Sequence, residues 1–224
     1  MRAFLFDLDG TLVDTERENA DSIERVLTAR GRPLSAEERE FVIGHGWREI
    51  YQHLVTHGGI DLSFAELKEL SAEEKERIVD EAGGLRVLPG AVEFVRRAAR
   101  FGPCTVVSGS SRREIAFCIH RLGLGDVIPW FVGAEDVAHG KPSPEGYLLA
   151  ARRLREQHGE ITPADCIVFE DSTAGVAAAR AAGTYCVALE AGNFSRQDQS
   201  QAQLRVANFL EIGDRFFPAF ERHP

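Results

Sequence analysis

The chain has 224 residues, of which 44% are hydrophobic and 27% charged, and its net charge at pH 7 is −9. This composition is ordinary for a globular protein with a sizeable core, and the acidic balance disfavours nucleic acid as a partner because nucleic-acid binding needs a basic surface. No stretch reaches the ~18 apolar residues of a membrane span, and four scattered cysteines without a CxxC pair predict a reducing, cytoplasmic setting.

Short apolar segments rich in β-branched or aromatic residues recur along the chain and predict strands. They lie at 3–9, 104–109, 166–171 and 186–191, with weaker candidates at 130–135 and about Leu204–Ala207. Segments with helical spacing of apolar residues stand between them, at 91–102, 111–124, 143–159 and 172–183. Because strands and helices alternate, we expect an α/β fold built on a parallel sheet.

The segment from 15 to 85 differs from the rest of the chain. It is helical in period and strongly charged, it contains no convincing strand pattern, and it directly follows the first predicted strand. We therefore predict a helical domain of residues 15–85, inserted into an α/β core formed by residues 1–14 and 86–224. Its acidic runs are interpreted as solvated helix faces.

Polar residues lie at the carboxyl ends of the predicted strands. In an open α/β sheet, ligands bind at the carboxyl ends of the strands, so these residues are the candidates for a common site. The set comprises Asp7 and Asp9 at the end of the first strand, Ser108, Gly109 and Ser110 at the end of the second, Glu170, Asp171 and Ser172 at the end of the strand at 166–171, and Lys141 in the loop before the helix at 143–159.

This set of residues has a chemical logic. Crowded carboxylates repel one another unless a cation lies among them, and a few oxygen ligands together with substrate phosphate suit Mg²⁺. One carboxylate can act as a nucleophile that forms an aspartyl-phosphate, while a second serves as general acid and then as base for water. Lys141, the Ser108 hydroxyl and the backbone N–H groups of Gly109 and Ser110 would stabilise the phosphoryl group.

Two other metal sites are disfavoured by spacing. An EF-hand loop that began at Asp7 would need glycine at its sixth position, where the chain has Leu12. A zinc protease helix with His53 and His57 would need glutamate between them at position 54, which is Leu54. We therefore interpret the two histidines as surface residues.

Four stretches, "DLDGTLVDTE", "VVSGSSR", "HGKPSPE" and "VFEDSTAGVAAARAAG", resemble in order the motifs of the haloacid dehalogenase superfamily, in its phosphatases with a helical cap. The resemblance covers nearly the whole chain and implies a Rossmann-like sheet with an inserted helical cap domain. It implies Asp7 as the nucleophile, Asp9 as the acid/base, Ser108 as a phosphoryl-binding residue and Lys141 as the residue that orients both. It further implies Mg²⁺ held by Asp7, the backbone carbonyl of Asp9 and Asp171, with Glu170 supporting the metal site.

Substrate specificity is expected to lie in the cap, at "VIGHGWREI" (42–50). Related enzymes use a glycine-containing stretch here to contact the part of the substrate that is not transferred. We hypothesise that Gly44, His45 or Arg48 makes this contact. The alternative, in which Trp47 and Ile50 face the cap core and Arg48 is solvated, stays open.

Two further functions compete with hydrolysis. A sugar phosphomutase resembling β-phosphoglucomutase shares the fold and motifs, but such enzymes carry a histidine in the first cap helix where this chain has about Asn19. An inactive binding protein would have lost part of the motif set, and none of it is lost. We expect a cytoplasmic, Mg²⁺-dependent phosphomonoesterase, monomer or weak homodimer, acting on a small phosphorylated metabolite such as a sugar or polyol phosphate.

Overall fold

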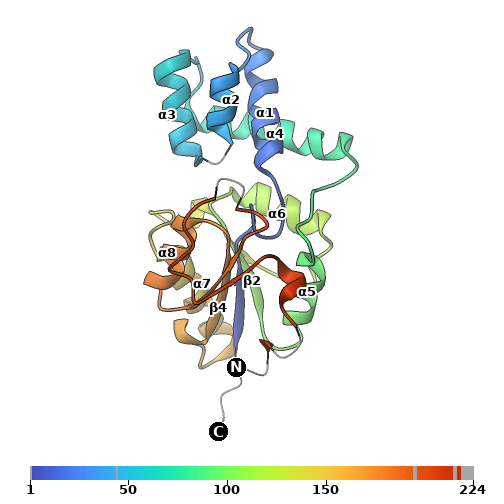
Figure 1. Cartoon of the computed structure of the whole chain (residues 1–224), viewed down its shortest axis with the longest axis vertical. Helices are drawn as coiled ribbons and strands as arrows, with labels where there is room; N and C mark the ends of the chain where they lie inside the picture. Colours follow the sequence, from blue (N-terminus) through green and yellow to red (C-terminus); the bar gives the residue numbers. More distant parts are fainter. Residues whose placement is uncertain (1, 44, 194–195, 214–215, 218–224) are drawn as a thin grey trace. The chain divides into compact units, whose positions relative to one another are not determined.

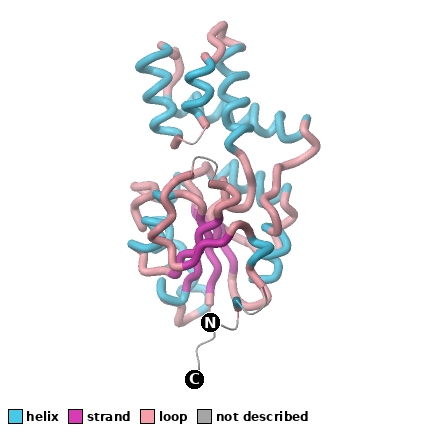
Figure 2. The backbone as a smooth tube through the Cα atoms, in the orientation of Figure 1, coloured by secondary structure: helices cyan, strands magenta, loops and turns pink. Residues whose placement is uncertain are grey.

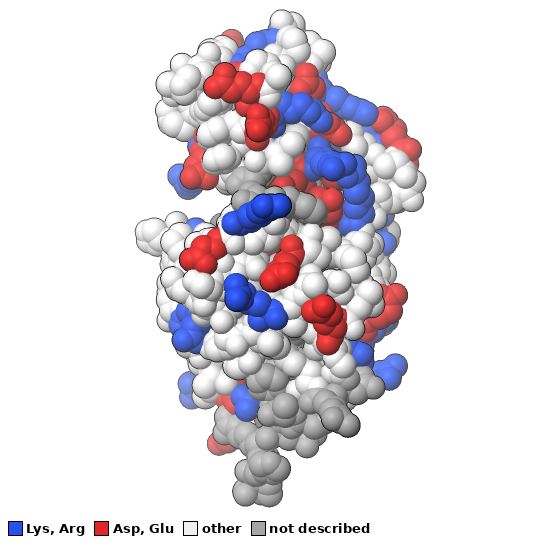
Figure 3. Space-filling model, in the orientation of Figure 1, with Lys and Arg blue, Asp and Glu red and all other residues white. Residues whose placement is uncertain are grey.

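The computed structural model describes residues 2–43, 45–193, 196–213 and 216–217. Its internal contacts divide the chain into two compact units, Met1–Asp14 with Arg86–Pro224 and Thr15–Leu85. Within the described ranges, no helix combines the length and the apolar character that crossing a membrane requires. On the face drawn in Figure 3, acidic and basic side chains are interspersed over each unit.

The first unit is built on a parallel sheet flanked by helices, which confirms the predicted α/β fold (Figures 1 and 2). In the described residues the sheet has six strands in the order β3-β2-β1-β4-β5-β6. The strands are β1 Ala3–Phe6, β2 Cys104–Val107, β3 Phe131–Val132, β4 Cys166–Glu170, β5 Tyr185–Leu189 and β6 Leu204–Val206. The helices and 3₁₀ turns are α5 Ala91–Ala98, α6 Arg112–Arg121, η1 Ala134–Asp136, α7 Glu145–His158, η2 Pro163–Asp165, α8 Thr173–Ala181 and η3 Phe209–Glu211.

The central strands are apolar throughout because helices cover both faces of the sheet. Side chains alternate between the faces, so that Leu5 of β1 and Val168 of β4 pack in one cluster with residues of α7 and α8. Phe6 points to the other face, where its ring stacks on Phe169 at 5.0 Å and meets Phe94 of α5 edge-on at 6.3 Å. The two faces therefore have different neighbours, and only one of them adjoins α7.

The strand order sets the place where a ligand can bind. From β1 the chain proceeds to β2 and β3 on one side and then crosses to β4, which pairs with the other side of β1. The carboxyl ends of β1 and β4 thus flank the point at which the strand order reverses, and open α/β sheets bind ligands in the crevice at such a point. The weakly predicted strand near Leu204–Ala207 is present as β6 and pairs with β5.

The second unit contains helices α1 Glu16–Thr28, α2 Ala36–Val42, α3 Trp47–Gly58 and α4 Phe64–Glu81. Capping boxes start two of them: the Ser35 and Ser63 hydroxyls each accept a backbone N–H bond from a glutamate three residues on, whose side chain bonds back. Apolar residues of all four helices form this unit's own core. Most charged residues of the acidic runs are exposed or half-buried, as the helical period predicts, but Glu38 and Lys75 within those runs are buried.

Candidate active site

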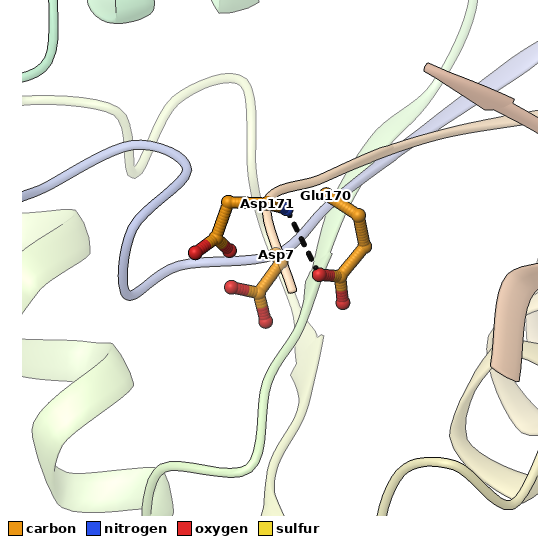
Figure 4. Close-up of side chains that lie close together, drawn as sticks. All are labelled: Asp7, Glu170 and Asp171. Atoms are coloured by element: carbon orange, nitrogen blue, oxygen red, sulfur yellow. Dashed lines mark hydrogen bonds between the residues drawn. The ribbon is translucent and has the colours of Figure 1, made fainter. Parts of the chain in front are cut away.

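Two carboxylates are brought together where β1 and β4 end. The strands pair in parallel, and the backbone N–H of Asp7 donates to the carbonyl of Phe169 at 3.0 Å. Asp7, which follows β1, and Glu170, the last residue of β4, therefore lie side by side on the face of the sheet that adjoins α7. Asp171 comes next in the chain, and one ligand oxygen from each of Asp7, Glu170 and Asp171 lies within 4.8 Å of the others (Figure 4). All three are buried.

Lys141 lies between two of these carboxylates. Its Nζ donates to Oδ1 of Asp7 and to Oε1 of Glu170. Burial acts to lower the pKa of Lys141, but the charges of Asp7 and Glu170 outweigh it and raise that pKa above its usual value. The loop before Lys141 is fixed by α7, because the Glu145 carboxylate accepts the backbone N–H groups of Ala138 and His139 at 2.8 and 2.9 Å.

Glu170 is held by donors on both of its oxygens. Oε1 accepts from Lys141 and, at 2.7 Å, from the hydroxyl of Tyr147. Oε2 accepts from the backbone N–H of Asp171 at 3.1 Å and from the N–H and hydroxyl of Ser172 at 3.3 and 3.2 Å. These five donors outnumber the roughly four lone-pair sites of a carboxylate, so its capacity to accept hydrogen bonds is filled. The contacts therefore favour Glu170 as a residue that orients Lys141, and its predicted role in supporting a metal stays a prediction.

The charge balance of the cluster suits a divalent cation. Three carboxylates face one ammonium group. Burial raises the pKa of Asp7 to about 8, against the opposing effect of Lys141, and burial together with Glu170 raises the pKa of Asp171 well above its usual value. Charged carboxylates are thus unfavourable here without further positive charge. Asp7 and Asp171 supply hard oxygen ligands of the kind that Mg²⁺ prefers.

The carboxylate of Asp9 lies beside the loop that follows β2. Its Oδ2 accepts from the hydroxyl of Ser110 and, at 3.5 Å, from that of Ser108. The N–H of Ser110 in turn donates to the Ser108 hydroxyl at 3.0 Å. A Cβ added to Gly109 would meet no atom within 4 Å. The structure thus joins Asp9 to the predicted phosphoryl-binding residues, while the Asp9 side chain is not part of the Asp7–Glu170–Asp171 cluster.

A tight turn after β1 carries Asp9 and leads out of the sheet. Gly10 has φ +81°, a conformation that other residues rarely adopt, and a Cβ there would lie 2.1 Å from Oδ2 of Asp171. Thr11 donates from its hydroxyl to the other oxygen of Asp171 at 3.2 Å. The "DGT" of the first motif therefore both makes the turn and holds the carboxylate of Asp171.

Glycine is also expected to be required at position 175, because any side chain there would clash with a carboxylate of the site. A Cβ there would lie 1.9 Å from Oε1 of Glu170, and the five donors on Glu170 leave that carboxylate little room to move. We expect Gly175→Ala to lower the free energy of unfolding by about 1–3 kcal/mol through overpacking. Urea unfolding measures this effect, with Gly125→Ala as the control, because a Cβ at Gly125 meets nothing within 4 Å. Equal stability of the two variants would contradict the close packing inferred here.

The residues predicted to set specificity belong to the helical unit. Gly44 lies outside the described residues. His45 is exposed, and its ring stacks on Phe41 at 3.9 Å. Arg48 is also exposed, with its guanidinium 5.9 Å from the ring centre of Phe64. Trp47 packs against the core of this unit, so the arrangement of this stretch resembles the alternative in which Arg48 faces solvent.

The histidines predicted to be on the surface are partly stacked. The ring of His53 lies 3.9 Å from that of Phe41 and 4.4 Å from that of His57. His57 is exposed and His53 half-buried. Together with His45 and with Phe41 of α2, they line a hollow beside α3.

Two residues of the site gave no sequence signal. Tyr147 belongs to the apolar face of α7, where a tyrosine is indistinguishable by spacing from a core phenylalanine. Gln199 precedes β6 in a polar stretch, and its Nε2 donates to the backbone carbonyls of Asp171 and, at 2.9 Å, of Leu189. Helical spacing assigns Tyr147 to the core, and only the folded structure shows that its hydroxyl reaches Glu170.

Comparison with known proteins identifies the family of this chain. The haloacid dehalogenase-like hydrolase family matches residues 1–183. Hexitol phosphatase A of Escherichia coli is 33% identical, with 85% of this chain and 83% of that protein covered. The bifunctional riboflavin kinase/FMN phosphatase of Arabidopsis thaliana is 32% identical over 83% of this chain, which spans only 47% of that protein's length.

The fold has solved counterparts as well. The crystal structure of CbbY from Rhodobacter sphaeroides in complex with phosphate superposes with a TM-score of 0.82 at 26% identity, covering 95% of this chain and 97% of that one. The family match spans well over half of the chain, and the relatives are named as phosphatases. The chain therefore belongs to the haloacid dehalogenase-like hydrolase family and is an enzyme of its phosphatase type.

Proposed function

We propose that this protein is a Mg²⁺-dependent phosphomonoesterase that hydrolyses a small phosphorylated metabolite through an aspartyl-phosphate on Asp7. The observation that carries the proposal is the buried convergence of Asp7, Lys141 and Asp171 where β1 and β4 end. A phosphoryl group needs both a nucleophile and neutralising charge, and this cluster supplies the first and part of the second.

The chemistry divides between two aspartates. Lys141 bonds Oδ1 of Asp7, so we assign Oδ2 as the oxygen that attacks phosphorus while the ester P–O bond breaks. Asp9 donates its proton to the leaving oxygen. Asp9 then takes a proton from water, the water oxygen bonds to phosphorus, and the acyl phosphate bond breaks to return Asp7 as a carboxylate. When bound, Mg²⁺ held by Asp7, Asp171 and the Asp9 carbonyl supplies positive charge that offsets the carboxylates and the phosphoryl oxygens.

The loop after β2 prepares Asp9 for this role. Hydroxyl bonds from Ser108 and Ser110 hold its carboxylate, which fixes where a proton is delivered. We propose that Ser108 and the backbone N–H groups of Gly109 and Ser110 also bind phosphoryl oxygens, with Glu170 supporting the metal site through Lys141. Residues 15–85 act as a cap on the core of 1–14 and 86–224, closing to exclude bulk water.

A sugar or polyol phosphate is the substrate class we favour. Hexitol phosphatase A among the relatives supports this choice. The alternative is a mutase resembling β-phosphoglucomutase, which must protect its phosphoenzyme from water. Asn19 stands where such mutases carry a histidine, which favours hydrolysis. We further propose a cytoplasmic monomer or weak homodimer, without nucleic-acid or membrane partners; the buried positions of all four cysteines suit a reducing compartment.

A phosphate-release screen over phosphorylated sugars, polyols and other small metabolites with Mg²⁺ tests the function. The panel includes β-glucose 1-phosphate with a glucose 1,6-bisphosphate primer, read for isomerisation as well as for free phosphate. Free phosphate from a sugar or polyol ester is the expected result. Isomerisation without release would establish the mutase instead, and no turnover of any ester would overturn the proposal.

Arg48 provides a test of the cap. If its guanidinium contacts a leaving group that is anionic or carries many hydroxyls, Arg48→Ala is expected to lower kcat/KM on the best substrate by about tenfold, the value of one charged hydrogen bond. Arg17→Ala is a matched control, because Arg17 is another exposed arginine of the same unit. Unchanged kcat/KM for Arg48→Ala would remove Arg48 from the specificity site.

A further inference from the structure

Tyr147 places its hydroxyl where the apolar core beside α7 meets the buried carboxylate of Glu170. The residue is 1% exposed and packs with Leu5, Val168 and Cys186 between α7 and the sheet. Its hydroxyl donates to Oε1 of Glu170 at 2.7 Å, the short distance expected when a hydroxyl donates to a carboxylate. A phenylalanine would fill the same space, so packing alone does not explain the hydroxyl.

The bond from Tyr147 acts on an oxygen that Lys141 also uses. Nζ of Lys141 donates to Oε1 of Glu170 and to Oδ1 of Asp7, and it lies 5.5 Å from the centre of the Tyr147 ring. The other oxygen of Glu170 is bound by the backbone N–H groups of Asp171 and Ser172. Glu170 therefore cannot turn away, and two donors share Oε1.

We propose that Tyr147 is a positioning residue that keeps Lys141 on Asp7. Its hydroxyl satisfies part of the hydrogen-bonding capacity of Oε1, which weakens the attraction of Glu170 for the shared ammonium group. Without the hydroxyl, Glu170 draws Lys141 toward itself, and Asp7 loses part of the contact that orients it for attack. The effect of Tyr147 on turnover rests on the proposed function, whereas its effect on the position of Lys141 does not.

Tyr147→Phe removes the hydroxyl and keeps the ring. We expect kcat to fall by about 10- to 100-fold, as for other residues that orient a catalytic group from behind. KM should stay within about twofold, because the lost interaction affects the chemical step rather than substrate binding. Thr105→Val is the matched control: Thr105 is fully buried in β2, and its hydroxyl donates to the carbonyl of Trp130 at 2.8 Å. Both variants should lose similar thermal stability, but only Tyr147→Phe should lose turnover.

A second background separates positioning from a general loss of packing. Glu170→Gln removes the charge through which Tyr147 is proposed to act. The double variant Glu170→Gln/Tyr147→Phe should therefore have the same kcat as Glu170→Gln alone. The same loss in both backgrounds would overturn the proposal, as would kcat of Tyr147→Phe within about twofold of wild type.

Crystal structures of the wild-type protein and of Tyr147→Phe decide the positioning directly. The proposal predicts that Nζ of Lys141 moves away from Oδ1 of Asp7 in the variant, and an unmoved Lys141 would overturn it. This readout holds even if the wild-type protein releases no phosphate from any ester, in which case the proposed function fails separately.

Discussion

Asp7→Asn is expected to abolish phosphate release, with kcat lowered by at least about 10⁴-fold, the scale of losing a covalent nucleophile. The amide keeps the shape of the side chain but is a far weaker nucleophile than the carboxylate. It also removes a charge that is unfavourable in this setting, since burial raises the pKa of Asp7 to about 8. The variant should therefore fold, and without Mg²⁺ its melting temperature should equal or exceed that of the wild type.

Steady-state kinetics on the best substrate and acid-quenched labelling with a ³²P ester measure this prediction. The wild-type protein should carry acid-stable, base-labile label, and Asp7→Asn should carry none. Asp126→Asn is the control, because Asp126 is an exposed carboxylate outside the cluster. Its Oδ2 forms an ion pair with the guanidinium of Arg96 at 3.0 Å. Turnover by Asp7→Asn above about 1% of wild type would rule out the covalent mechanism.

Much of the catalytic cluster follows from strand geometry alone. Asp7 and Glu170 each come two residues after an apolar residue that points to the α7 face, so their side chains point the same way. Parallel pairing of β1 with β4 then brings them together. The order of elements along the chain also places Lys141 at this edge. In a parallel α/β fold, the loop that joins a strand to the next helix lies at the carboxyl ends of the strands.

The remaining contacts could not be predicted because they depend on distances between segments far apart in sequence. Spacing gives Tyr147 to the core, and nothing in "EGYLLAA" indicates which acceptor its hydroxyl reaches. The need for glycine at 175 arises only from the close approach of α8 to Glu170. The position of Ser110 in its loop predicts phosphate binding, but the contact of its hydroxyl with Asp9 depends on how the turn at Gly10 folds back.

Removing divalent metal is expected to abolish activity and to destabilise the protein in a pH-dependent way. Asp7 has its pKa raised from 3.8 to about 8, and that of Asp171 is raised as well, in both cases chiefly by burial. Between about pH 4 and about pH 8, these carboxyl groups therefore keep their protons in the metal-free folded protein but lose them in the unfolded chain. The contribution of these groups to stability is therefore full below about pH 4 and is lost as the pH rises toward about 8.

Mg²⁺ should reverse this loss, because a bound cation stabilises the same carboxylates in their charged form and competes with protons. Saturating Mg²⁺ is expected to raise the melting temperature by about 5–10 °C over protein in EDTA, from a binding contribution of about 3 kcal/mol. The gain should be larger near pH 8 than near about pH 6, where protons already neutralise the cluster. In Asp171→Asn the gain should largely vanish, while Asp126→Asn should keep it. A gain that falls as the pH rises, or that survives unchanged in Asp171→Asn, would mean that the cation does not bind among these carboxylates.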